Sequence, residues 1–157
     1  MNELEVVNVR LVKEPSVYSE KKMSSPEDVV ELMAKEMAQY DREVFCILNM
    51  KNSGQIINMN IVSIGTINAS LVSPREVFKS SILSNASGII ALHNHPSGSI
   101  KPSKEDMAVT KRLRKCGALL DIELLDHIIV GGSNGEMFSF RNENMLDVQD
   151  KSEERER

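Results

Sequence analysis

Two histidines of the sequence have the spacing of paired metal ligands. His93 and His95 stand two residues apart at the end of an apolar run, Gly88 to His93, that predicts a buried central strand. Side chains at positions i and i+2 of a strand point to the same face, so both imidazoles can reach one ion. Asp106 follows eleven residues later, where Ser103-Lys104-Glu105-Asp106 is typical of a helix start.

These three side chains have the chemistry of an open zinc site. Zinc binds imidazole nitrogen and carboxylate oxygen tetrahedrally, and three protein ligands leave a fourth position for water, as in catalytic sites. The dipole at a helix N-terminus favours the ionised form of Asp106. We therefore expect one zinc ion per chain on His93, His95 and Asp106. The competing interpretation makes the histidines hydrogen-bonded loop residues and Asp106 a capping carboxylate only.

A water activated by zinc needs a general base, and Glu43 is the candidate. It opens the apolar segment Glu43 to Met50, which predicts a strand of the same sheet. Two other glutamates are rivals. Glu76 is better explained by a capping box that begins at Ser73, and Glu105 by exposure on a first helical turn.

Ser103 combines two roles because a hydroxyl group both accepts and donates a hydrogen bond. As N-cap it can accept from the backbone N–H of the third helical residue. Its hydrogen can then be donated to an oxyanion that forms beside the metal. Ser103 is thus a second candidate catalytic residue.

The candidate residues resemble the E…HxHx7SxxD signature of the JAMM (MPN-plus, JAB) metallopeptidase-like domain. Glu43 matches the E, His93 and His95 match HxH, and Ser103 and Asp106 match SxxD after a spacer of seven residues. The surrounding segments SIGTINASLVSPREVFK, HNHPSG and LLDHIIVGG resemble the RadC branch of that superfamily. The resemblance extends roughly from Pro26 to Phe140. Met1 to Gln39 shows no sign of the glycine-rich hairpin in the helix-hairpin-helix region of full-length RadC-like proteins, so we expect a short form.

The resemblance implies a three-layer α/β (α+β) fold, related to cytidine deaminases, with a mixed, curved sheet flanked by helices. It also implies zinc on His93, His95 and Asp106, with Glu43 as general acid/base and Ser103 steadying the tetrahedral intermediate. Relatives in the JAMM superfamily cleave peptide or isopeptide bonds, so the expected partner is a peptide or protein substrate. The RadC branch carries a DNA-repair label.

The length of 157 residues fits one domain with short appendages. We expect an arm or edge strand over residues 1–24, the JAMM-like domain over 25–145 and a charged, disordered tail over 146–157. The expected element order is αββαβαββ. Helices are predicted over Ser24–Gln39, from Ser73 to about Asn85 and from Ser103 to just before Gly117. Strands are predicted over Glu43–Met50, Gln55–Ile64, Gly88–His93, Asp121–Val130 and Glu136–Phe140.

Composition excludes several classes of protein. The net charge of −4 removes the general electrostatic attraction on which non-specific nucleic-acid binders rely. No apolar run approaches the ~20 residues of a membrane-spanning helix, and the N-terminus lacks the apolar core of a secretory signal. We expect a cytoplasmic protein without membrane contact. Cys46 and Cys116 are predicted to be reduced and buried.

Other interpretations stay open. The basic cluster Lys111 to Lys115 is typical of a solvated helix face, but it would also suit a DNA-repair-associated nucleic-acid-binding module. A third hypothesis is an inactive JAMM-type scaffold, with exposed strand edges such as Met1 to Lys13 supporting a homodimer. His127 is a candidate neighbour of the site because it too lies in an apolar strand, but the structural interpretation is preferred. The letters HNH at residues 93–95 are a coincidence with the nuclease motif of that name, whose residues are dispersed.

Overall fold

A computed structural model describes residues 3–14, 26–65, 72–131 and 136–146 of the chain. The order of helices and strands is the predicted αββαβαββ. The helices are α1 (Pro26–Met37), α2 (Pro74–Leu83) and α3 (Lys104–Leu120). The strands are β1 (Val44–Met50), β2 (Ile56–Ile64), β3 (Gly88–Asn94), β4 (Glu123–Val130) and β5 (Met137–Ser139).

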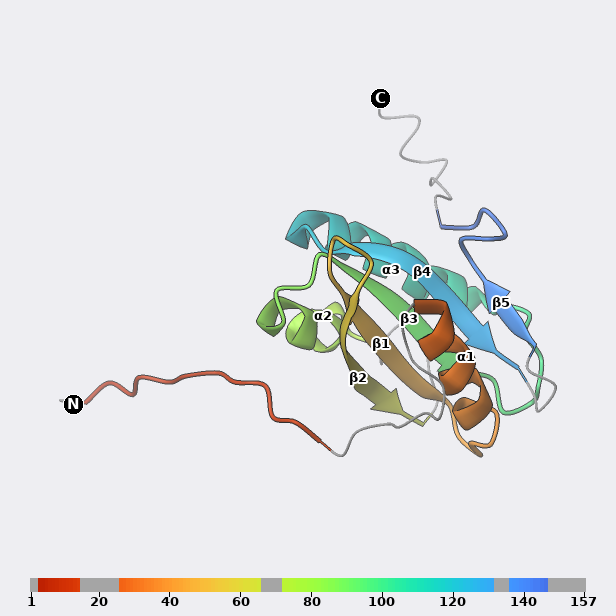
Figure 1. The fold of residues 1–157 in the computed structure, drawn as a ribbon, viewed down its shortest axis with the longest axis horizontal. Coiled ribbons are helices and arrows are strands. Elements are labelled where there is room, and N and C mark those ends of the chain that lie inside the picture. The colour runs from red at the N-terminus through yellow and green to blue at the C-terminus, as the bar shows by residue number, and fades with distance from the viewer. Residues whose placement is uncertain (1–2, 15–25, 66–71, 132–135, 147–157) are drawn as a thin grey trace, which may run out of the picture.

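The strands form one mixed sheet in the order β2-β1-β3-β4-β5 (Figure 1). β1 pairs antiparallel with both β2 and β3, while β3 and β4 are parallel and are connected through α3. β1 and β3 are buried along their whole length, as expected of strands covered on both faces. The predicted central strand is confirmed, and the two predicted strands before it pair with each other as β1 and β2.

Helices cover both faces of the sheet, so that helix, sheet and helix form three layers. α1 packs on one face, where its buried side chains join Cys46, Leu48 and Leu92 in one apolar cluster. On the opposite face α2 and α3 pack on Phe45, Ile47 and other residues of a second cluster. Figure 1 shows α1 in front of the sheet and α3 behind it. The predicted mixed, helix-flanked α+β fold is confirmed.

α1 spans Pro26–Met37 and ends earlier than the predicted Gln39. Ser24 and Ser25, where the predicted helix begins, lie outside the described residues. Its buried side chains are Val30, Met33, Ala34 and Met37. The apolar positions Val29, Leu32, Met33 and Met37 predict one buried face; the two methionines are buried as expected, whereas Val29 and Leu32 are half-buried.

Two predictions about helix ends are wrong. Ser73 is the N-cap of α2, but its side chain makes no capping hydrogen bond, and Glu76 pairs instead with Lys79 at 3.0 Å. α3 does not stop before Gly117 but runs on to Leu120, with Asp121 in the left-handed conformation as C-cap. Gly117 permits close packing: a Cβ atom there would lie 2.2 Å from the Ile122 carbonyl oxygen.

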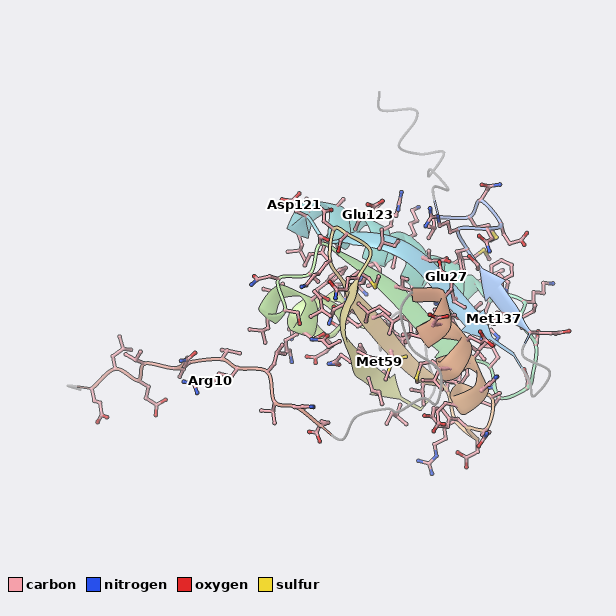
Figure 2. The ribbon with its side chains drawn as sticks, in the orientation of Figure 1. Arg10, Glu27, Met59, Asp121, Glu123 and Met137 are labelled. Carbon is pink, nitrogen blue, oxygen red and sulfur yellow. The ribbon has the colours of Figure 1, made fainter. Side chains whose placement is uncertain are left out.

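Residues 3–14 form an extended arm rather than a paired strand, and the arm runs away from the domain (Figure 1). Figure 2 shows the side chain of Arg10 on this arm.

Cys46 is buried as predicted, whereas Cys116 is only partly buried, and both are free thiols. Among the described residues no helix has the length and hydropathy needed to cross a bilayer. Of the predicted tail at 146–157, only Leu146 belongs to the described residues.

Candidate metal centre

The end of β3 and the first turn of α3 bring His93, His95 and Asp106 together. The Nε2 atoms of the two histidines are 3.1 Å apart. His93 Nε2 lies 3.0 Å from Asp106 Oδ1, and His95 Nε2 lies 3.1 Å from Asp106 Oδ2. One potential ligand atom from each residue thus lies within 4.8 Å of the others. The three residues predicted as ligands form a single cluster.

The helix cap fixes the Asp106 carboxylate. Ser103 Oγ accepts a hydrogen bond from the Asp106 backbone N–H at 3.0 Å, and the Ser103 N–H donates to Asp106 Oδ2 at 2.8 Å. Burial alone would raise the pKa of Asp106, but hydrogen bonds with His93 and His95 outweigh it and hold the pKa well below its usual range. Asp106 is consequently an anionic group at neutral pH, fixed in place by its own helix.

The two imidazoles differ in their surroundings. His93 is buried within the sheet, whereas His95 is half-buried and follows the last residue of β3. The backbone N–H of His95 donates to Val130 of β4 at 3.0 Å, which holds the residue at the strand end. The hydrogen bond to Asp106 raises the pKa of His95, although burial opposes it.

Glu43 immediately precedes β1 and lies near the cluster. Phe45 pairs with His93 in the antiparallel register, so residues 43, 45 and 93 share one face of the sheet. The Asn94 side chain holds the segment around Glu43 against β3. Its Oδ1 accepts a hydrogen bond from the Val44 N–H at 2.7 Å, and its Nδ2 donates one to the Arg42 carbonyl at 2.8 Å. The charge of Glu43 contributes to the raised pKa of His95.

The other candidates lie elsewhere or face solvent. Ser103 is exposed at the start of α3, so its hydroxyl is accessible while it caps the helix. Glu105 is exposed on the first turn, as predicted, and Glu76 is on α2. In the basic cluster, Arg114 donates to the Leu124 carbonyl at 3.0 Å. That arginine serves packing of α3 on β4.

Two further residues support the cluster: His127, for which the sequence favours a structural role, and Thr110, which sequence reasoning missed. His127, interpreted as structural, is fully buried in β4 with its Nε2 2.8 Å from His93 Nδ1. Thr110 lies one turn after Asp106 on α3, and its hydroxyl is 2.5 Å from His127 Nδ1. The i, i+4 spacing from Asp106 was the available signal for Thr110, but pairing it with His127 required knowledge of how α3 lies on β4.

The donor atoms of the cluster suit a metal ion of intermediate softness. Two imidazole nitrogens and one carboxylate oxygen match the ligand set of catalytic zinc sites. The two Nε2 atoms lie 3.1 Å apart, and each lies within 3.1 Å of one Asp106 oxygen. At this spacing lone pairs repel unless a proton or a cation lies between them. The residues fit such an ion.

Comparison with known proteins gives a consistent family match. Residues 23–145 match the model of the RadC-like JAB domain. The chain is 51% identical over 109 residues to a UPF0758 protein of Shouchella clausii, covering 69% of this chain and 47% of that protein. It is 44% identical over 135 residues to a UPF0758 protein of Methanosarcina mazei, covering 86% of this chain and 56% of that protein. The chain spans about half the length of the curated relatives it matches.

Proposed function

The chain belongs to the family of RadC-like JAB domains, and from this premise we propose that it is a zinc-dependent hydrolase that cleaves an amide bond in a peptide or protein. The observation that carries the proposal is the convergence of His93, His95 and Asp106 beside an accessible hydroxyl and a glutamate. An amide is the bond proposed because its hydrolysis needs both an activated water and a stabilised oxyanion.

His93, His95 and Asp106 would hold the ion. When bound, zinc supplies a Lewis acid that polarises a carbonyl group and makes a neighbouring water more acidic. The protein side chains supply proton transfer and orientation. The capping hydrogen bonds keep the Asp106 carboxylate in one orientation, so little side-chain freedom is lost when it ligates.

Glu43 accepts a proton from the attacking water as the water oxygen bonds to the carbonyl carbon. Ser103 donates its hydroxyl hydrogen to the carbonyl oxygen while negative charge develops there. When the carbon–nitrogen bond breaks, Glu43 returns the proton to the leaving nitrogen, which departs as an amine. The same glutamate thus acts first as base and then as acid, and the protons balance.

The decisive variant is Glu43→Gln, which removes the base while leaving all three proposed ligands intact. We expect about one zinc per chain in elemental analysis and loss of turnover on a panel of fluorogenic peptides and lysine isopeptides. Glu105→Gln is the matched control, because Glu105 is exposed on α3, and it should retain activity. Undiminished hydrolysis by Glu43→Gln would refute its role. A wild type that binds no zinc would refute the metal site itself.

A further inference from the structure

His93 differs from His95 in what holds the nitrogen that faces away from the proposed metal site. The Nδ1 atom of His95 lies 2.8 Å from the backbone carbonyl of Ser99. A carbonyl oxygen only accepts, so Nδ1 of His95 carries a hydrogen, and in the neutral ring Nε2 keeps the lone pair that a metal ion needs. The Nδ1 atom of His93 instead meets another imidazole, His127 Nε2, at 2.8 Å. An imidazole nitrogen can donate or accept, so this contact alone does not fix the tautomer of His93.

The contacts continue beyond His127. His127 Nδ1 lies 2.5 Å from the Thr110 hydroxyl, and that hydroxyl is 2.9 Å from the Asp106 backbone carbonyl. His93, His127 and Thr110 are each at most 2% exposed, so water does not compete for these bonds. His127 is also stacked on Phe140, with ring centroids 4.8 Å apart and nearly parallel planes. Each ring nitrogen of His127 thus has one hydrogen-bonding partner, His93 at Nε2 and Thr110 at Nδ1.

Such a chain has two self-consistent directions. In the first, Thr110 donates to the Asp106 carbonyl, His127 donates from Nδ1 to Thr110, and His93 donates from Nδ1 to His127. Nε2 of His93 then has a free lone pair. In the second direction, Thr110 donates to His127 Nδ1, His127 donates from Nε2 to His93, and the hydrogen of His93 sits on Nε2. That hydrogen points at Asp106 Oδ1, 3.0 Å away, and blocks ligation.

We propose that Thr110 and His127 are positioning residues that set the tautomer of His93, with the Asp106 carbonyl as the acceptor that makes the ligating direction available. Metal ligands usually donate their second N–H to a carboxylate, a carbonyl or water, and here a buried imidazole and a hydroxyl extend that arrangement by two steps. This inference rests on the metal site of the proposed function. The inference adds that zinc affinity depends on the Thr110 hydroxyl group, although this group contacts no side chain of a proposed ligand.

The test compares Thr110→Val, which keeps the shape but lacks the hydroxyl, with Thr110→Ser, which keeps the hydroxyl. Zinc affinity is measured by competition with a chromophoric chelator. In Thr110→Val the N–H of His127 loses its acceptor in the ligating direction. Loss of such a supporting partner typically weakens metal binding about 10–100-fold. Thr110→Ser should bind within about threefold of the wild type. Circular dichroism checks that both variants are folded.

A second measurement needs no variant. Long-range proton–nitrogen NMR spectra of the zinc-loaded wild type identify which ring nitrogen carries hydrogen. We expect Nδ1–H on both His93 and His127. In metal-free Thr110→Val the hydrogen of His93 should move to Nε2, while His95, held by a backbone carbonyl, keeps Nδ1–H as an internal control.

The possible failures are distinguishable. If the wild type binds zinc and Thr110→Val matches Thr110→Ser in affinity, the positioning role is wrong and the metal site stands. An Nε2–H signal from His127 in the zinc-loaded wild type would also overturn the positioning role. If the wild type binds no zinc, both the metal site and the inference built on it fail.

Discussion

The Asn94 side chain accepts a hydrogen bond from the Val44 backbone N–H across 2.7 Å at the point where β1 begins. It also donates to the Arg42 carbonyl, so one buried amide is bonded on both sides of Glu43. This side chain sits between the two proposed metal-ligating histidines in sequence but makes its bonds to the neighbouring strand. It therefore joins the ligand-bearing strand to the segment that carries the proposed base.

Replacing Asn94 by Ala should separate the proposed catalysis from metal binding. The change leaves the buried Val44 N–H without its partner, a loss that costs about 1–3 kcal/mol, and removes the part-buried bond to the Arg42 carbonyl. We expect the free energy of unfolding in urea to fall by at least that amount, amide hydrolysis to drop, and zinc content to stay near one per chain. Asn142→Ala is an exposed control that should change stability by less than about 0.5 kcal/mol. Equal effects of the two variants would contradict the bridging role.

Ser103 allows a structural role to be separated from a chemical one. Ser103→Ala removes the N-cap acceptor of α3 and should cost about 1 kcal/mol, whereas Ser103→Gly should cost only a few tenths. Both lack the hydroxyl, so both should lower the turnover number by roughly 10²–10³, the usual loss for one oxyanion donor. Chemical denaturation and single-turnover kinetics provide the two readouts. Activity that follows stability, with Ser103→Gly nearly as active as the wild type, would leave Ser103 as a cap only.

Zinc should stabilise the fold through mass action. A ligand at one hundred times its dissociation constant raises the free energy of unfolding by up to about 2.7 kcal/mol when it binds only the native state. Asp106→Asn keeps the size of the side chain but removes the anionic ligand. Its thermal midpoint should be nearly the same with and without zinc, while that of the wild type rises. A chelator should reverse the rise, and an equal zinc effect in the variant would argue against Asp106 as a ligand.

Gly117→Ala should destabilise the protein although alanine is the better helix former. The intrinsic preference favours alanine by about 1 kcal/mol in a helix. The added Cβ would lie 2.2 Å from the Ile122 carbonyl oxygen, so α3 must shift against the backbone that leads into β4. Overpacking of this kind costs about 1–3 kcal/mol. Ala118→Gly, at the exposed neighbouring position, measures the stability difference that comes from helix propensity alone. A Gly117→Ala variant more stable than the wild type would exclude the close contact.

Because the Cys46 thiol is buried, we expect the free energy of unfolding to fall at alkaline pH. Burial raises the pKa of this thiol from 9.0 to about 12, so between those values the folded chain keeps a proton that the unfolded chain releases. The native state then binds more protons, and stability falls as pH rises, by about 1.4 kcal/mol per pH unit for this group. Urea titrations of the wild type and Cys46→Ala from pH 9 to 11 measure the difference in slope. Parallel curves would show that the thiol is not the cause.

The ligand cluster was predictable because each part of its signal is local. The alternation of a strand places His93 and His95 on one face, and the capping box places Asp106 in a first helical turn. The supporting residues depend on long-range pairing. His127 meets His93 through the parallel register of β3 and β4, which sequence periodicity does not encode. The same holds for Asn94, whose partners precede it by about fifty residues.

The order of elements was also predictable, while several helix details were not. Alternating and continuous apolar runs identified all five strands. The capping box at Ser73 failed because Glu76 found a closer partner in Lys79. Gly117 predicts a helix end because glycine favours that position, but in the structure its missing side chain permits close packing inside α3. Local propensity is overruled in both places by a neighbouring group.

The proposed ligands all lie within residues 93–106, a span consisting of one strand end, one loop and one helical turn. Contacts of such short sequence separation form early in folding, because little loop entropy opposes them. Glu43 joins only when β1 pairs with β3, across a much longer stretch of chain. A metal ion present during folding could thus join β3 to α3 before the sheet is complete. Zinc would then guide the order of assembly as well as serve the finished protein.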